Sequence, residues 1–393
     1  MKIAIPKGFK AAGVHAGFKK KPDFAMVVCD EPCDWAGVFT ANKMAAAPVK
    51  DCEAKLGGKV KAVIVNSGMA NACTGKKGAT AVEESCKIAA KTLQCPEKQI
   101  LQASTGVIGQ PLDVSKIGKG IGLAMKSVGS GKKDFLAAAK AIMTTDKWMK
   151  VSSAEMVVGG KKVALFGMAK GAGMINPCMA TMLCFLMTDA AVEKKELQAA
   201  LEKAVGKTFN SISVDGETST NDSVILIASG RAGNEEIKAG SGEAEKFENA
   251  LEKVCLELAL EIVSDGEGAT KLLEVVVSGA ANGEDAEKAA AAVVNSLLVK
   301  TALAGGDPNW GRIASAAGAS GALVEEEKTS VSICGVTLYE KGEPTGKEAA
   351  AAKKMKKKKI VVEVELGLGS GGSKKWGCDL GQAYVALNSK YHT

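Results

Sequence analysis

The sequence predicts an α/β protein in which helices flank layered sheets of mixed or antiparallel strands. Helical and strand-like patterns alternate irregularly along the chain, and hairpin signals stand among them, whereas a parallel sheet would need a regular series of strand–helix–strand units. The length of 393 residues allows two domains and a large hydrophobic core.

The first part of the chain predicts strands before its first long helix. Apolar runs predict strands near residues 24–30, 35–40 and 61–66. Residues 77–93 then have helical spacing, which places on one face Val82, Cys86, Ala89, Ala90 and Leu93.

The next segment combines a strand, two helices and a hairpin. The strand "QILQAST" ends in a loop of small residues, Ser104, Thr105 and Gly106. Helices follow near 113–127 and 132–143, and two strand-like runs then flank Gly159 and Gly160, which is a good hairpin signal. The loop "KGAGMINP" leads into the apolar run around Thr181.

The C-terminal half continues this irregular order. It predicts helices near 193–206 and 243–263, a strand near 271–278, one long Ala-rich helix near 284–303, a hairpin around Gly335, and a last strand and helix. The run "KKMKKKK" at 353–359 is interpreted as part of a solvated helix.

The composition predicts where the protein is located and which kinds of partner it does not bind. The longest apolar stretch, Met179 to Met187, is too short for a membrane helix, and the N-terminus lacks the pattern of a secretory signal. Eleven scattered cysteines without a CxxC pair predict buried thiols in a reducing intracellular compartment rather than disulfides or a zinc site. The net charge of +7 comes partly from the lysine run, and with only 4% aromatic residues it does not predict nucleic-acid binding.

Two glycine-rich motifs do not match the patterns of nucleotide-binding sites. "GLGSGG" at 367–372 follows a strand but leaves only Asp379 as a later acidic residue, much too soon for a ribose contact, so a glycine turn is expected. "GSGKKD" at 129–134 has Lys133 where a phosphate-binding loop needs Ser or Thr.

Six polar loops rich in Gly and Asp predict an active site assembled from distant segments. They are "STG" at 104–106, "TTD" at 144–146, "KGAGM" at 170–174, "DGETSTND" at 215–222, "DGEGATK" at 265–271 and "GDPNWGR" at 306–312. Taken singly, each could be a helix cap or a turn.

Thr181 is the candidate nucleophile, although a threonine in a short apolar run is more often a strand residue. His15 and His392 are the only histidines, so the base of a covalent mechanism is expected to be another group. A cut between Ala180 and Thr181 would expose an α-amine, whose reference pKa of about 8 is well below that of lysine. Before the cut, the Thr181 hydroxyl could attack the Ala180 carbonyl itself.

The chain resembles the ArgJ family, the ornithine acetyltransferases (glutamate N-acetyltransferases) of arginine biosynthesis. The resemblance is carried by "GMAKGAGMINPCMATML", "SVDGETSTNDSV", "DGEGATK", "LVKTALAGGDPNWGRI" and "WGCDLGQAYVALNSKYHT", and it extends from "IPKGFKAAGVHAG" to the last residue. It implies the self-cleaving, N-terminal-nucleophile fold of that family and cleavage between Ala180 and Thr181 into chains of residues 1–180 and 181–393.

The resemblance also implies a reaction and its participants. Thr181 would take acetyl from N2-acetyl-L-ornithine and pass it to L-glutamate by a ping-pong mechanism, with no metal or organic cofactor. Some members also accept acetyl-CoA, which would add amino-acid N-acetyltransferase activity, and the sequence leaves this open. The two chains are expected to stay associated as a heterotetramer with two copies of each. The tail "GSKKWGCDL" and the cysteine count resemble plastid members, which favours the stroma (chloroplast) for a eukaryotic source, with bacterial cytoplasm or mitochondrial matrix as alternatives.

Residue roles follow from the same motifs. Thr105 and Gly106 would form the oxyanion hole, and the expected substrate contacts are Thr144 (in preference to Thr145), Lys170, Thr181, Glu267, Asn388 and Thr393. Lys170 suits an α-carboxylate, and Glu267 could hold the ornithine ammonium or move a proton.

Two other classes of function stay open at this point. A self-cleaving amidase or aminopeptidase would use the same threonine but pass the acyl group to water. A non-catalytic carbohydrate- or nucleic-acid-binding protein would use the basic surface and would not need Thr181.

Overall fold

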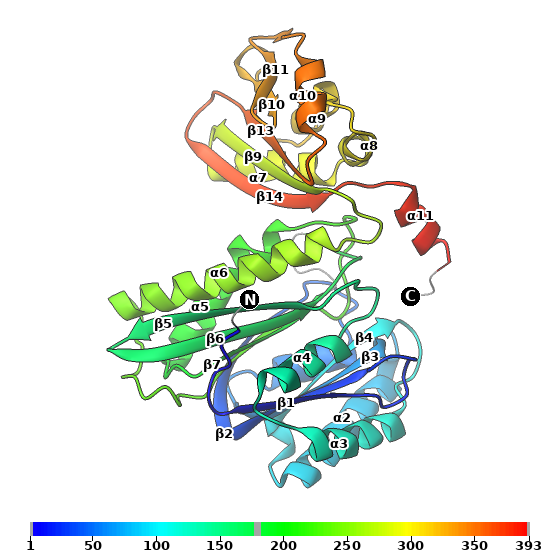
Figure 1. Cartoon of the computed structure of the whole chain (residues 1–393), viewed down its shortest axis with the longest axis vertical. Coiled ribbons are helices and arrows are strands. Elements are labelled where there is room, and N and C mark those ends of the chain that lie inside the picture. Colours follow the sequence, from blue (N-terminus) through cyan, green and yellow to red (C-terminus); the bar gives the residue numbers. More distant parts are fainter. Residues whose placement is uncertain (1–2, 177–181, 391–393) are drawn as a thin grey trace.

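The computed structural model describes residues 3–176 and 182–390 and consists of two sheets with helices packed on them (Figure 1). The strands are β1 (Phe9–Val14), β2 (Phe24–Phe39), β3 (Lys59–Met69), β4 (Ile100–Val107), β5 (Lys150–Val158), β6 (Lys161–Lys170), β7 (Leu183–Thr188), β8 (Ser223–Ala228), β9 (Leu272–Ala280), β10 (Ser330–Ile333), β11 (Val336–Glu340), β12 (Glu343–Pro344), β13 (Lys359–Glu365) and β14 (Gly371–Cys378). The α-helices are α1 (Ala47–Ala54), α2 (Gly75–Leu93), α3 (Val114–Ser127), α4 (Lys132–Ala141), α5 (Lys194–Lys207), α6 (Gly242–Ser264), α7 (Gly283–Asn295), α8 (Leu297–Gly305), α9 (Trp310–Gly318), α10 (Glu348–Lys354) and α11 (Gln382–Asn388).

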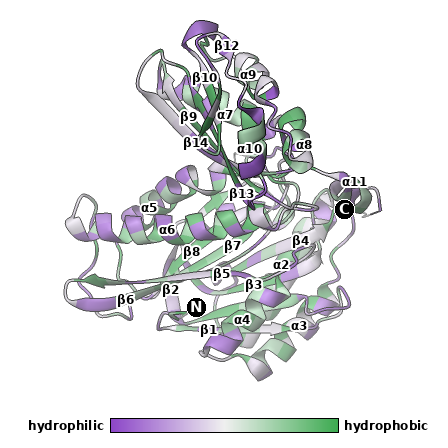
Figure 2. Cartoon of the chain, turned by 45° about the horizontal axis from the view of Figure 1, so that its top comes forward, coloured by the Kyte–Doolittle hydropathy of each residue, from purple (hydrophilic) through white to green (hydrophobic). Residues whose placement is uncertain are grey.

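The larger sheet has the strand order β4-β3-β2-β8-β7-β6-β5, with β1 paired to β2. The pairs β3–β4 and β7–β8 are parallel, and the other pairs in this sheet are antiparallel. The sheet is therefore mixed, as the irregular order of elements predicts. Its central strands β7 and β8 are buried along their whole length, and Figure 2 shows their hydrophobic character.

Helices cover the larger sheet on both faces. On one face lies α4, which contacts β1, β2, β5 and β6 and sets Phe135 edge-on against Phe166 of β6, with 5.4 Å between the ring centroids. On the other face α5 and α6 pack over β2, β5 and β6, and α2 packs over β4. Each of these helices buries an apolar stripe, which is where most of its stabilisation comes from.

The smaller sheet has the order β12-β11-β10-β13-β9-β14 and lies beyond α6, whose other side contacts β14 (Figure 1). Only β9 and β13 are parallel in this sheet. Helix α7 packs on β9 and β14 and closes a second core.

The segment around residue 181 does not separate two folding units. Strands β7 and β8, which follow residue 181, lie between β2 and β6, which precede it. The predicted boundary at 180/181 would therefore divide the chain within one continuous sheet, whereas the second sheet begins with β9.

Several predicted elements are confirmed. Helix α2 buries Val82, Cys86, Ala89 and Ala90 on one face, as the spacing predicts. The hairpin β5–β6 turns at Gly159 and Gly160, whose φ values of 53° and 74° suit a tight two-residue turn. Gly367, with φ of 63°, lies in the turn between β13 and β14, so "GLGSGG" forms a turn as expected.

Other predictions are wrong, for identifiable reasons. The two strands expected at 24–30 and 35–40 are one strand, β2, whose register shifts between Val28 and Cys33. The single Ala-rich helix is two helices, because Ser296 adopts an extended conformation (ψ 115°) and caps α8 through the Val299 amide. Strand β4 continues through the expected loop to Val107.

The lysine run does not form a helix along its whole length. Helix α10 ends at Lys354, and strand β13 begins at Lys359. The lysines of the run are exposed while Met355 is buried, so the expectation of solvation is correct and that of helicity is not.

Of the helices that the structure describes, none is by itself both long and apolar enough to cross a bilayer. Helices α7 and α8 meet that test only as a pair, and they are bent by 52° at their junction.

Candidate functional site

Six of the residues predicted for the site line one cavity of about 140 Å³. These are Thr105, Gly106, Thr144, Lys170, Glu267 and Asn388. The cavity wall also contains Thr145, Ala172, Gly173, Met174, Asp215, Glu217 and Tyr384, which the sequence did not single out as site residues, apart from Thr145 as the alternative to Thr144. Five of the six polar loops thus meet at one place.

The end of β4 forms one wall. Gly106 has a φ of +130°, and a Cβ atom there would lie 2.3 Å from the carbonyl carbon of Gly68 on the parallel strand β3. Only glycine combines this φ with so close an approach of two backbones. The conformation holds the Thr105–Gly106 peptide at the cavity wall, as a donor group for a developing negative charge would require.

Lys170, the last residue of β6, is the buried cation of the cavity. Its ammonium group donates to Thr105 Oγ1 over 3.1 Å. Burial lowers the pKa of Lys170, and the nearby Asp146 carboxylate opposes that effect. Because a buried charge needs a partner, an anionic group that enters the cavity would be stabilised beside Lys170.

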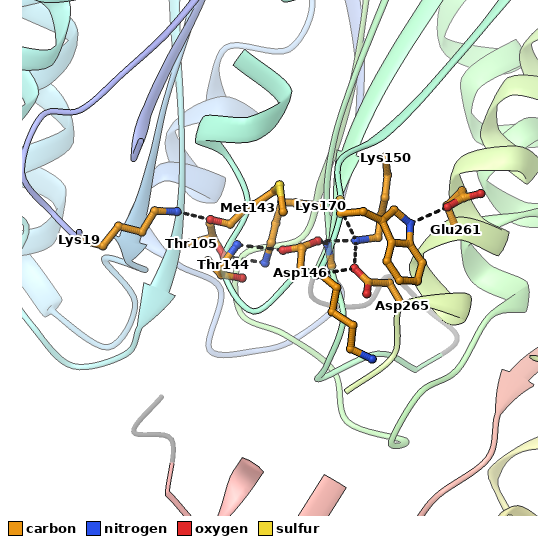
Figure 3. A network of polar contacts seen from close by, with 12 residues as sticks. Lys19, Thr105, Met143, Thr144, Asp146, Lys150, Lys170, Glu261 and Asp265 are labelled. Atoms are coloured by element: carbon orange, nitrogen blue, oxygen red, sulfur yellow. Dashed lines mark hydrogen bonds and ion pairs between the residues drawn. The ribbon is translucent and has the colours of Figure 1, made fainter. Parts of the chain in front are cut away.

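A buried ionic network supports the same wall (Figure 3). Lys150 on β5 lies 2.6 Å from carboxylate oxygens of both Asp146 and Asp265. Asp146 also accepts the amides of Thr144 and Gly171, so it ties together two loops that line the cavity. Burial alone would raise the pKa of Asp146, but the ammonium groups of Lys170 and Lys150 bring it down to about 2.

Lys19 extends this network and was not predicted. Its ammonium group donates to the Met143 carbonyl, beside Thr144 (Figure 3). Burial, helped by the positive charge of Lys170, lowers the pKa of Lys19 to about 8.

The opposite wall is acidic. Glu267 accepts a 2.9 Å hydrogen bond from the Asn388 side chain, which anchors α11 to the cavity. Asp215 accepts the amides of Met174 and Ile175 and the hydroxyl of Tyr384. The amide of Glu267 also donates to the Ala172 carbonyl over 2.7 Å, so this wall is joined to the "KGAGM" loop.

The predicted nucleophile Thr181, its neighbour Ala180 and the predicted contact Thr393 lie outside the described residues. The described chain nevertheless reaches the cavity close to residue 181, because Leu183 at the start of β7 pairs with Lys170 at the end of β6.

Asp222 is a buried carboxyl group next to this segment. It precedes β8 and accepts the Met182 amide over 2.9 Å, and its Oδ2 atom has no hydrogen-bond partner among the described residues. Burial raises the pKa of Asp222 to about 8. The motif "DGETSTND" drew attention to this loop, but nothing in it distinguishes Asp222 from an ordinary turn residue.

Asp222→Asn is expected to change how stability depends on pH. Because the folded-state pKa lies above the reference value of about 3.9, folding is favoured by protonation: the stabilisation is complete below about pH 4 and is lost as the pH rises through 8. The free energy of unfolding of the variant should therefore rise, relative to that of the wild type, by about 1.4 kcal/mol for each pH unit between about pH 4 and 8. Urea unfolding at pH 5, 6 and 7, with all variants made in the uncut Thr181→Ala background, measures this, and Asp189→Asn, at a buried carboxylate at the other end of β7, is the control. A difference that does not vary with pH would contradict the expectation.

Gly106→Ala is expected to lower the thermal midpoint far more than Gly109→Ala. Both glycines have positive φ, so both substitutions strain the backbone, by about 1–3 kcal/mol. A Cβ at Gly109 meets nothing within 4 Å, whereas at Gly106 it meets the backbone of Gly68, so Gly106→Ala adds the cost of separating β3 from β4 to the backbone strain. Equal midpoints for the two variants would show that the strands tolerate the methyl group.

One predicted polar loop lies away from the cavity, and two neighbouring threonines both reach it. "GDPNWGR" does not line the cavity: Asn309 caps α9, where Trp310 stacks on Tyr339 at 4.7 Å in the second core. Both Thr144 and Thr145 line the cavity, so its geometry does not choose between them. No histidine of the described residues lines it.

A family model described as "ArgJ family" matches residues 10–393. A protein of Rhodopirellula baltica, named Arginine biosynthesis bifunctional protein ArgJ, is 45% identical over 395 residues, which cover 99% of this chain and 96% of that protein. A protein of the same name from Caldanaerobacter subterraneus is 45% identical over 399 residues, covering all of this chain and 98% of its own.

A crystal structure of the arginine biosynthesis bifunctional protein ArgJ from Bacillus halodurans is also similar. It is 44% identical and has a TM-score of 0.51. The match covers 98% of the crystallised chain but only 53% of this one.

Proposed function

The chain belongs to the ArgJ family, and we propose from this membership and from the cavity that it transfers the acetyl group of N2-acetyl-L-ornithine to L-glutamate. The names of its relatives place them in arginine biosynthesis, and this is the pathway proposed here. The donor and the acceptor are both α-amino acids, so each brings a carboxylate to the site.

One observation carries the proposal. The cavity brings together a buried cation, Lys170, the glycine peptide at Gly106 and a carboxylate, Glu267, and Lys170 pairs with Leu183, two residues after Thr181 in the sequence. An N-acetyl amino acid needs these groups: a cation for its carboxylate, amide donors for the oxyanion of its acetyl group, and a carboxylate near the departing amine.

We propose that the protein matures by cleavage between Ala180 and Thr181. The Thr181 hydroxyl oxygen attacks the Ala180 carbonyl carbon, the C–N bond breaks, and water hydrolyses the resulting ester to leave Thr181 with a free α-amine. The length of the crystallised relative supports this proposal, because it corresponds to about half of this chain, whereas the other relatives match over their whole length.

The transfer then proceeds in two steps. The α-amine of Thr181 accepts the hydroxyl proton while the oxygen attacks the acetyl carbon, and the Thr105–Gly106 wall stabilises the negative oxygen. The C–N bond breaks, and the proton passes to the amine of the departing ornithine. The amine of glutamate attacks the acetyl ester, which restores free Thr181. The proposed steps use no metal or organic cofactor, and loss of activity on dialysis against a chelator would contradict this.

The decisive experiment follows ornithine and N-acetylglutamate when the purified protein receives N2-acetylornithine with and without glutamate. A transferase releases ornithine at a rate that depends on glutamate and forms N-acetylglutamate in equal amount. An amidase or aminopeptidase would release ornithine equally fast without glutamate, and that result would overturn the proposal.

Three finer points are also proposals. Acetyl-CoA with glutamate tests whether the protein has a second acetyl donor. Light scattering tests the expected heterotetramer. The plastid stroma rests on the tail "GSKKWGCDL" and the cysteine count, whereas the relatives named above are bacterial, so bacterial cytoplasm and the mitochondrial matrix remain the alternative locations.

A further inference from the structure

We propose that Glu217 selects the substrate with a positively charged side chain, by pairing with the side-chain ammonium of N2-acetylornithine. This inference rests on the proposed function, in which two substrates use one cavity in turn. Their α-carboxylates are alike, but one side chain ends in an ammonium group and the other in a carboxylate. The cavity must therefore hold opposite charges at the same distal position.

The charged groups of the cavity differ in how firmly they are held. Lys170 is buried and bonded to Thr105 Oγ1, Asp215 is held by two backbone amides and by Tyr384, and Glu267 is held by Asn388. The carboxylate of Glu217 has no hydrogen bond or ion pair to any described residue. It is the exposed acidic group of this wall, so pairing with a ligand breaks no contact of the described protein.

The position of Glu217 suits the distal end of a substrate. Its own amide reaches Asp215 Oδ1 at 3.4 Å, which places Glu217 at the start of the acidic wall. Glu217 also lies near Tyr384. The pKa of the Tyr384 hydroxyl is raised mainly by burial and further by the negative charges of Asp215, Glu267 and Glu217. Lys170, which would hold the common α-carboxylate, is only 2% exposed, so a substrate anchored there extends from the buried end toward the exposed wall.

The neighbouring backbone lets Glu217 serve both substrates. Gly216 has a φ of +79°, which is a turn conformation that glycine adopts without strain. An exposed carboxylate can pair weakly with an ammonium group, and it can turn toward water when a carboxylate arrives. A buried, fixed carboxylate would instead repel glutamate, and this is why Glu217 rather than Glu267 is assigned to the ammonium.

The test compares Michaelis constants of Glu217→Gln for both substrates in the acetyl-exchange reaction. The expected result is a three- to fivefold higher KM for N2-acetylornithine, an equal or lower KM for glutamate, and an unchanged kcat. Glu217→Lys should raise the KM for N2-acetylornithine further and should lower the KM for glutamate. Raising the salt concentration should increase the KM for N2-acetylornithine in the wild type and have less effect on it in Glu217→Gln.

Two further variants make the result specific. Glu235→Gln removes an exposed carboxylate that does not line the cavity, and it should change neither constant. Glu267→Gln should lower kcat for the exchange as a whole. If Glu217→Gln shifts both constants together or shifts neither, Glu217 does not select the donor. A wild-type protein that exchanges no acetyl would instead refute the proposed function, so the two failures are distinguishable.

Discussion

Thr181→Ala is expected to leave the protein as one uncut chain without acetyl transfer. The hydroxyl is the attacking group both in the proposed cleavage and in the proposed reaction, so a single substitution removes both. Loss of a catalytic nucleophile typically lowers kcat by about 10⁵–10⁶-fold. Intact mass spectrometry should find a single species near 40.3 kDa for the variant and two chains, broken between Ala180 and Thr181, for the wild type.

Two control variants distinguish chemistry from structure in this experiment. Thr181→Ser keeps a hydroxyl at the same position and should still be cut. Thr188→Ala removes a buried hydroxyl at the other end of β7, where it donates to the Ala164 carbonyl, and should cost stability but not cleavage. A wild-type protein that transfers acetyl while uncut, or a Thr181→Ala variant that is cut, would contradict the mechanism.

Lys150→Met is expected to destabilise the fold by about 3–5 kcal/mol. Lys150 is fully buried between Asp146 and Asp265, and its loss leaves two buried carboxylates without their shared cation. The comparison is best made in the Thr181→Ala background, where the chain is expected to stay uncut and unfolding stays unimolecular. Urea unfolding then gives the free energy difference directly.

The control for Lys150 is an exposed pair. Lys207 lies 2.8 Å from Glu252 at the surface, where its side chain is 55% exposed. Lys207→Met should therefore change the free energy of unfolding by less than about 1 kcal/mol. If the two substitutions change the free energy of unfolding equally, other groups must stabilise the carboxylates of Asp146 and Asp265 when Lys150 is absent.

The sequence predicts local elements well where the local pattern alone determines them. The Gly159–Gly160 turn and the buried face of α2 depend only on neighbouring residues, and both are confirmed. Strand β8 has the sequence SVILIA, which is buried on both faces and therefore shows no alternation; it was not predicted. The break at Ser296 was missed because a serine cap does not interrupt an Ala-rich helical pattern.

The sequence motifs predict six residues that line the cavity, but they do not predict the contacts that support its walls. Thr105, Lys170, Glu267 and Asn388 come from four distant segments, and the resemblance to the family grouped them before the structure did. The partners Asp146, Asp265 and Asp222 depend on which loops the sheet register brings together, and no spacing along the chain encodes that.

The strand order of the larger sheet determines how the cleaved protein could refold. If residues 181–393 become a separate chain, they supply β7 and β8, and the strands on both sides of this pair belong to residues 1–180. Neither piece could complete this sheet alone, so folding has to precede the cut. Denatured mature protein would then have to recover by a two-body reaction, with a yield that falls on dilution, whereas the precursor folds by itself. Cleavage would thus replace the folding of one chain by the reassembly of two.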